Sequence, residues 1–71
     1  MTNSAILERK IKESGLKRSF IANKMGISLY SLSLKINNTS EFKASEIETL
    51  CSILDLKVEE RMIIFFASDV D

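Results

Sequence analysis

The sequence contains no proline, no histidine and no tryptophan, and it has only two glycines and one cysteine. An all-β chain needs turn residues every few positions, so the shortage of proline and glycine argues against that class. Without histidine, the chain lacks the commonest acid–base catalyst and the histidine ligands of zinc fingers. A single cysteine excludes an internal disulfide. We therefore expect no enzyme, no cofactor and no metal site.

Long apolar runs are also absent. No run reaches the roughly 18 residues that a membrane-spanning helix requires, and charges are spread through the first 14 residues, unlike in a signal peptide. We expect a cytoplasmic protein that makes no membrane contact. Its 71 residues suit one small domain, 1–71, because a chain this short buries only about 60% of its unfolded surface.

Charge is balanced over the whole chain but segregated along it. Residues 1–43 hold eight Lys or Arg against three Glu, a surplus of five positive charges. Residues 44–71 hold two against seven, a surplus of five negative charges. Zero net charge argues against a nucleic-acid binder, whereas a segregated surface can still present a basic face to an anionic partner.

Helical periodicity runs through nearly the whole chain and predicts five helices. Asn3 or Ser4 can cap the first helix, which Gly15 can end. Gly26 follows the last turn of the second helix, and Ser28 can cap the third. Residues 37–40 read as a turn. The apolar positions expected to face the core are Ile6, Leu7, Ile11, Ile21, Ala22, Met25, Leu32, Ile36, Ile47, Leu50, Cys51 and Leu54. Asp55 ends the fourth helix, and a short fifth helix is expected over residues 58–64.

The apolar run over residues 62–66 allows two interpretations. It is either the end of the fifth helix, packed on the core, or a strand that pairs with a second copy of the chain. A bare run of this kind in so small a domain would be an association site. The segment 62–71, apolar and then acidic, is thus a candidate dimer contact.

The segment over residues 18–32 carries the strongest signal for function. Two short helices are separated by a turn of about three residues, which is typical of a helix-turn-helix. Ala22 is small where the helices would cross, and Gly26 permits a positive φ. Ile27 would anchor the turn in the core, and Leu32 would pack between the third helix and the second.

This segment and the five-helix layout resemble the Cro/CI-type helix-turn-helix regulators of phages and prophages. The resemblance covers about residues 5–64 and includes Ile21-Ala22, Gly26-Ile27-Ser28, Leu32-Ser33, Lys35-Ile36-Asn37-Asn38, Ser40-Glu41-Phe42 and the stripe Ile47, Leu50, Leu54-Asp55-Leu56. It implies a compact all-α bundle of the lambda-repressor type, with the motif formed by helices two and three. It also implies that the third helix enters the major groove of DNA.

Projected at about 100° per residue, the third helix places Leu32 and Ile36 toward the core. Tyr30, Leu34 and Asn37 point away, with Ser33 beside them and Leu29 at the boundary. Hydroxyl groups of Tyr30 and Ser33 can bond bases or phosphates, and a leucine can touch a thymine methyl. The resemblance implies phosphate contacts by Arg18 and from the loop after the third helix. The predicted DNA-binding residues are Arg18, Ser28, Leu29, Tyr30, Ser33, Leu34, Asn37, Asn38, Ser40 and Lys43.

The expected function is sequence-specific binding of a double-stranded DNA operator by a homodimeric transcriptional regulator, a prophage repressor or Cro-like protein. The third helix is poor in the Arg, Gln and Asn residues that usually read bases, and Leu34 stands where related proteins often carry a polar residue. A protein-interaction module on the same fold, antirepressor-like or antitoxin-like, is therefore the alternative. It would bind a regulatory protein partner through Tyr30, Leu34 and Phe65-Phe66.

Overall fold

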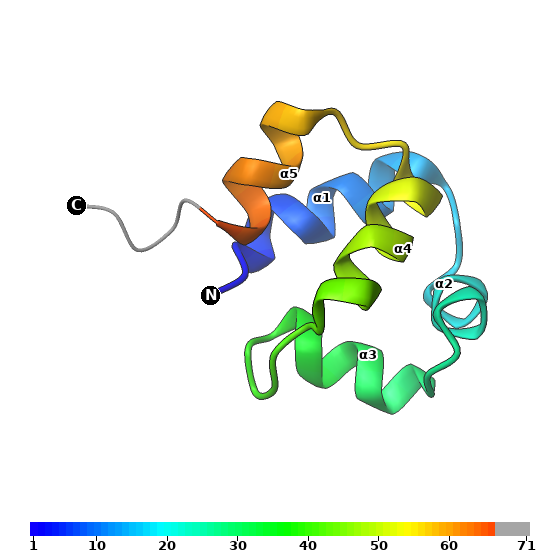
Figure 1. Cartoon of the computed structure of the whole chain (residues 1–71). Coiled ribbons are helices and arrows are strands. Elements are labelled where there is room, and N and C mark those ends of the chain that lie inside the picture. Colours follow the sequence, from blue (N-terminus) through cyan, green and yellow to red (C-terminus); the bar gives the residue numbers. More distant parts are fainter. Residues whose placement is uncertain (67–71) are drawn as a thin grey trace.

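The computed structural model describes residues 1–66 and shows five α-helices, with no strand among these residues (Figure 1). The predicted all-α, five-helix class is therefore confirmed. The helices are α1 (Ser4–Ser14), α2 (Arg18–Met25), α3 (Leu29–Ile36), α4 (Ala44–Leu54) and α5 (Val58–Phe65).

The helix ends follow from local side-chain chemistry. The side chain of Asn3 accepts a hydrogen bond from the Ile6 N–H at 3.2 Å and thereby caps α1. Gly15 and Gly26 end α1 and α2 with φ of 74° each, in the left-handed region that glycine enters without penalty. Asp55 takes the same region, with φ of 54°, after α4. The expected boundaries at these residues are confirmed.

Each of the five helices contributes two residues to one buried cluster. The cluster consists of Leu7 and Ile11, Ile21 and Ala22, Leu32 and Ile36, Leu50 and Cys51, and Ile64 and Phe65. Met25, Ile27, Ile47 and Leu54 pack against it while staying partly exposed. Burial raises the pKa of the Cys51 thiol, which fits the expectation that Cys51 serves as a small apolar core residue.

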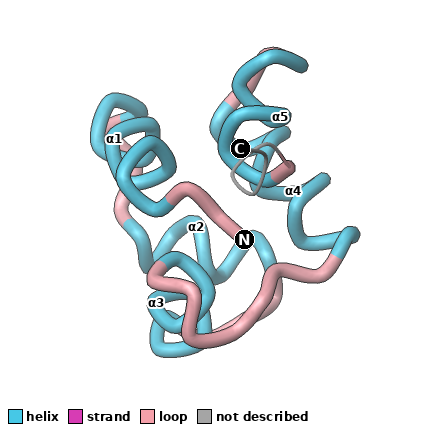
Figure 2. Tube along the Cα trace, turned by 90° about the vertical axis from the view of Figure 1, so that its left-hand side faces the viewer, coloured by secondary structure: helices cyan, strands magenta, loops and turns pink. Residues whose placement is uncertain are grey.

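The helices place α3 along one edge of the molecule. In Figure 1, α3 lies below α4, and α2 is seen nearly end-on beside it. Figure 2 separates α1 and α3 from α4 and α5, with the long connection from α3 to α4 passing between the two pairs. The N-terminus lies beside the end of α5, where the Asn3 N–H donates to the Ile64 carbonyl at 2.7 Å.

The apolar run at residues 62–66 is the end of a helix, so the interpretation as a strand is wrong. Ile64 and Phe65 are buried, and the ring of Phe65 meets the ring of Phe42 edge to face, with 5.6 Å between centroids. Met62, Ile63 and Phe66 remain about half exposed. Packing on the core is thus confirmed for Ile64 and Phe65, two of the five residues of the run, while residues 67–71 of the candidate dimer contact lie outside the described part.

Among the helices of residues 1–66, none is both long enough and apolar enough to cross a bilayer.

An ion pair joins the end of α3 to the start of α4. The ammonium of Lys35 lies 3.1 Å from a carboxylate oxygen of Glu46, and both side chains are nearly buried, at 12% and 11% exposed. The same oxygen accepts the Lys43 N–H at 2.8 Å. Burial alone would raise the pKa of Glu46. The hydrogen bonds from Lys43 and Lys35, with their positive charges, outweigh burial and hold the pKa below its ordinary value.

The turn between α2 and α3 gives a first prediction. A Cβ added at Gly26 would meet no atom within 4 Å, so Gly26→Ala should cost only the left-handed backbone strain, about 1 kcal/mol of unfolding free energy. Gly15→Ala is the matched control, with the same φ and the same open space. Urea denaturation should give nearly equal losses. A loss several times larger at Gly26 alone would contradict the described turn.

The Glu46 pair gives a second prediction. A carboxyl whose pKa is lowered by folding stabilises the folded state above its unfolded pKa, and this contribution disappears as the pH falls through the folded pKa. Glu46→Gln should therefore reduce the unfolding free energy by about 1 kcal/mol at pH 7 and by much less at pH 3. The exposed Glu48 supplies the control, since Glu48→Gln should change stability by under about 0.5 kcal/mol. An equal loss from Glu46→Gln at both pH values would refute this role.

Candidate nucleic-acid interface

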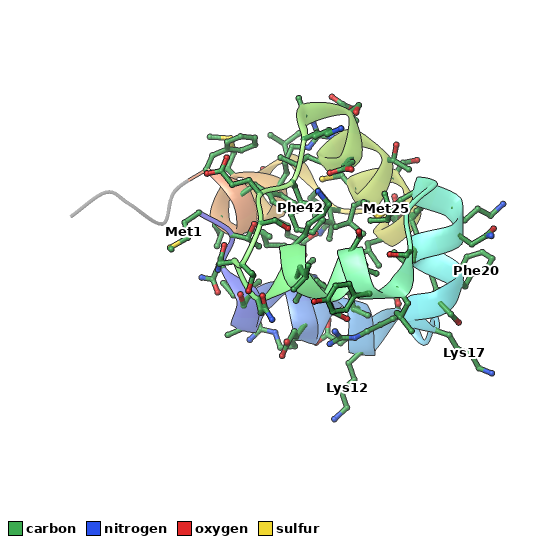
Figure 3. The ribbon with its side chains drawn as sticks, turned by 90° about the horizontal axis from the view of Figure 1, so that it is seen from below. Met1, Lys12, Lys17, Phe20, Met25 and Phe42 are labelled. Carbon is green, nitrogen blue, oxygen red and sulfur yellow. The ribbon has the colours of Figure 1, made fainter. Side chains whose placement is uncertain are left out.

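The first turn of α3 presents its side chains to solvent. The hydroxyl of Ser28 accepts the Ser31 N–H at 3.0 Å and so caps the helix, as expected. Tyr30 is 72% exposed and Leu29 is 48% exposed, whereas Leu32 and Ile36 on the opposite side are buried. Figure 3, viewed from below Figure 1, looks onto the face of the molecule that α3 forms. The exposed side of α3 is thus left uncovered by the other helices of residues 1–66.

The second half of α3 is less open than the projection suggested. Leu34 is only partly exposed, like Ser33. The chain turns back directly after α3, and the N–H groups of Thr39 and Ser40 both bond to the Leu34 carbonyl, at 2.9 and 3.2 Å. This return brings loop backbone beside the end of the helix. Leu34 therefore does not point fully away from the protein.

Asn37 is exposed and ends α3. Its side-chain oxygen accepts hydrogen bonds from the Thr39 hydroxyl at 2.7 Å and the Thr39 N–H at 3.1 Å. Its side-chain NH2 group has no hydrogen bond within residues 1–66. Asn37 therefore keeps two donors for an outside acceptor.

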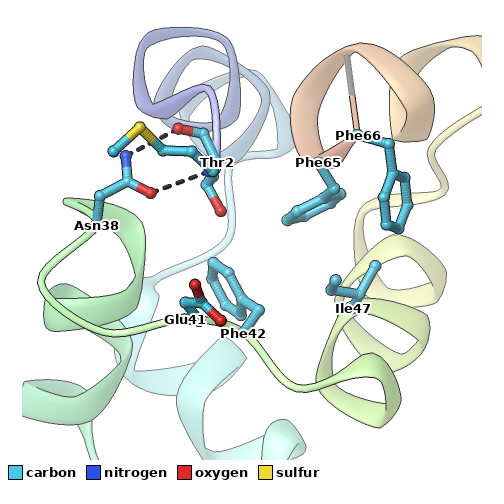
Figure 4. Close-up of a pocket in the computed structure, with 8 residues that line it drawn as sticks. Thr2, Asn38, Glu41, Phe42, Ile47, Phe65 and Phe66 are labelled. Carbon is cyan, nitrogen blue, oxygen red and sulfur yellow. Dashed lines mark hydrogen bonds between the residues drawn. The ribbon is translucent and has the colours of Figure 1, made fainter. Parts of the chain in front are cut away.

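Asn38 is engaged within the chain. Its φ of 69° turns the backbone back, and its amide pairs with the backbone of Thr2, accepting the N–H at 2.9 Å and donating to the carbonyl at 2.8 Å (Figure 4). It also donates to the Ser4 hydroxyl at 3.2 Å. Both donors of the side chain are used, so its predicted phosphate contact gains no support from this geometry.

A pocket opens beside this pairing. Its walls come from the N-terminal residues, the loop before α4, the first turn of α4 and the end of α5, and its apolar lining includes Phe42, Ile47, Phe65 and Phe66 (Figure 4). The lining also includes the carboxylate residue Glu41. No group of His, Cys, Asp or Glu side chains in residues 1–66 is arranged to hold a metal ion. The lining therefore combines aromatic and aliphatic side chains with polar groups of Thr2, Asn38 and Glu41.

The start of α2 carries positive charge. Arg18 is its first residue, 40% exposed at the side chain, and a guanidinium nitrogen lies 3.7 Å from a carboxylate oxygen of Glu8. No side chain caps this helix, and the first N–H groups of a helix lack partners within it. Ser40 and Lys43 are exposed in the loop that leads to α4. The predicted phosphate contacts thus lie at the N-terminus of α2 and in the loop after α3.

Half of the cations in residues 1–43 are already paired. Arg9, Lys10, Arg18 and Lys35 each lie within 4.0 Å of a glutamate oxygen. No such pair occurs within residues 1–66 for Lys12, Lys17, Lys24 and Lys43, although the Lys24 ammonium lies 5.6 Å from the centre of the Phe20 ring. That contact joins two side chains of α2, and Phe20 remains 45% exposed.

Sequence reasoning overlooked Lys12 and Lys17 as candidate phosphate ligands. Both are exposed and project outward on the side of α1 and α2 (Figure 3). The available signal was position, since Lys17 directly precedes the first residue of α2, where backbone N–H groups also favour anions.

The outer face of α5 carries exposed apolar side chains. Val58, Met62 and Phe66 follow each other at intervals of four residues and are 73%, 49% and 55% exposed. Ile63 lies beside them, 48% exposed. Because residues four apart share one face of a helix, Val58 and Met62 lie on one face of α5, and Phe66 continues this stripe directly after the helix ends.

No curated protein and no solved structure matches this chain. The family model matches residues 3–68, which include all five helices, and carries the description "Protein of unknown function (DUF739)". Because the match spans nearly the whole chain, this protein belongs to the DUF739 family.

Proposed function

We propose that this protein is a sequence-specific double-stranded DNA-binding regulator, in which α2, the turn at residues 26–28 and α3 act as a helix-turn-helix. The single observation that carries the proposal is the division of α3 into two faces. Leu32 and Ile36 anchor the helix in the core, while Tyr30 on the other side is 72% exposed. A side chain of this size, held out by a rigid helix, suits insertion into a groove.

Residues 29–33 of α3 supply most of the base-reading groups. The major groove admits an α-helix, and there hydroxyl groups bond base edges while apolar groups touch thymine methyls. Tyr30 and Ser33 take the first role, and Leu29 takes the second. Leu34 can offer only part of its side chain to DNA, because it is partly buried. Asn37 adds two amide donors at the far end of the helix.

Phosphate contacts flank this helix on both sides. Arg18 and Lys17 lie at the start of α2, where uncapped N–H groups add to their attraction for anions. Ser40 and Lys43 lie in the loop after α3. Such contacts release counterions from DNA, so binding should weaken steeply with salt.

The regulator acts as a homodimer in this proposal. One domain of this size covers too little DNA for tight, selective binding, and a dimer on two half-sites about one helical turn apart overcomes that limit. The exposed stripe of Val58, Met62 and Phe66 on α5 supplies an apolar contact for the second copy. Occupying a promoter would then block transcription, an inference that rests on resemblance alone.

The same stripe favours a second candidate, a protein-interaction module. Phe65 is buried and cannot take the contact role expected for it, whereas Phe66 remains exposed. In this case α5 and Tyr30 would bind a regulatory protein, the complex would be insensitive to salt, and duplexes would not bind even near 50 mM salt.

Selection of duplexes from a random pool tests the function directly. We expect enrichment of a two-fold symmetric sequence, with affinity that falls linearly as salt rises on logarithmic axes. Enrichment without symmetry would remove the homodimer, and the absence of any bound duplex at low salt would favour the protein-interaction module.

Tyr30 gives the sharpest prediction for the DNA-reading face. Tyr30→Ala should weaken binding to the selected duplex about tenfold or more, the range of one good base contact, because α3 loses its most exposed side chain. The melting temperature should fall by less than about 4 °C, since no core contact is lost. Ser52→Ala, at an exposed position of α4, should change neither quantity. Unchanged affinity for Tyr30→Ala would contradict the assignment.

A further inference from the structure

A carboxylate of α1 lies against the arginine that begins α2. One oxygen of Glu8 is 3.7 Å from a terminal nitrogen of Arg18, and the two side chains are 52% and 40% exposed. Glu8 is the one acidic partner of Arg18 within residues 1–66. The pair joins two helices and places a negative charge at the proposed phosphate-binding end of α2.

The contact is too loose to hold the guanidinium fully. At 3.7 Å it exceeds the usual donor–acceptor distance of a hydrogen bond, about 2.7–3.2 Å. A guanidinium has five N–H donors and bonds a phosphate best through two parallel hydrogen bonds. The 3.7 Å approach of Glu8 forms no hydrogen bond with Arg18, so a phosphate oxygen can displace the carboxylate.

We infer that Glu8 competes with the DNA backbone for Arg18 and thereby lowers the affinity of this protein for every duplex. This inference rests on the proposed function. The carboxylate offsets part of the arginine's charge in the free protein, and that attraction is lost when Arg18 turns to a phosphate. Because phosphates carry no sequence information, the effect applies equally to specific and non-specific DNA. Glu8 is an affinity-setting residue that touches no base.

Glu8→Gln is the direct test, because it removes the charge and keeps the shape of the side chain. The energy of an exposed ion pair corresponds to about a two- to fivefold change in a binding constant. We expect Glu8→Gln to bind both the selected duplex and an unrelated duplex more tightly by about this factor. The ratio between the two affinities should stay unchanged. A residue with a purely structural role would not raise both affinities together.

Glu13→Gln is the matched control. Glu13 lies on the same helix and pairs loosely with Arg9 and Lys10, at 4.0 and 3.9 Å. It therefore reports the general effect of removing one negative charge from α1. The second control is Glu8→Gln in an Arg18→Ala background, where the gain should shrink to the level of Glu13→Gln.

The outcomes separate this inference from the function beneath it. Equal affinities for Glu8→Gln and Glu13→Gln would overturn the competition, and so would weaker binding by Glu8→Gln, which would mean that Glu8 orients Arg18 for DNA. The competition would also be overturned if Glu8→Gln raised the affinity in the Arg18→Ala background as much as it does in the unaltered protein. If the unaltered protein and both variants, folded by circular dichroism, bind no duplex at 50 mM salt, the proposed function itself fails.

Discussion

The burial of Leu32 and Ile36 is the constraint on which the account of this protein depends. Both side chains are essentially inaccessible to solvent, and losing such a residue from a core costs about 2–5 kcal/mol when it is cut to alanine. Their spacing of four residues fixes the rotation of α3 about its own axis. Once that rotation is set, Tyr30 has to face outward. The positive φ of Gly26 then sets how α3 leaves the end of α2. The exposed face of α3 is therefore a consequence of core packing.

The surplus of positive charge in the first part of the sequence is only partly available at the surface of the folded protein. Half of the cations in residues 1–43 are offset by nearby glutamates, and these pairs have different consequences. Lys35 and Glu46 are nearly buried and join α3 to α4, so their charges serve the fold. Arg18 and Glu8 are both substantially exposed, so their charges remain available to a ligand. The remaining positive charge lies on lysines such as Lys12 and Lys17, which project from α1 and α2 (Figure 3). The contribution of each lysine or arginine to DNA binding therefore depends on whether a nearby glutamate already offsets its charge.

Much of the fold could be predicted because its determinants are local. Asn3, Gly15, Gly26 and Ser28 mark helix ends through capping and positive φ, which act within a few residues. The core stripes follow from helical periodicity for the same reason.

The features that could not be predicted depend on contacts between distant segments. The pairing of Asn38 with Thr2 joins residues 36 positions apart, and the contact between Arg18 and Glu8 joins two helices. Leu34 was placed outward because a helical projection takes no account of the loop that returns beside α3. The run at residues 62–66 was ambiguous because β-branched and aromatic residues suit a strand as well as a buried helix end.

The central claim is that the outward face of α3 meets the bases of DNA, while the start of α2 and the loop before α4 contact the phosphates beside it. A titration of isotope-labelled protein with a selected duplex, followed by backbone amide chemical shifts, tests it most directly. The account predicts that the largest shifts fall at residues 28–34 and at the first residues of α2, with smaller changes in the loop before α4. Large shifts confined to α5 and the pocket beside Phe66, with residues 28–34 unaffected, would contradict it.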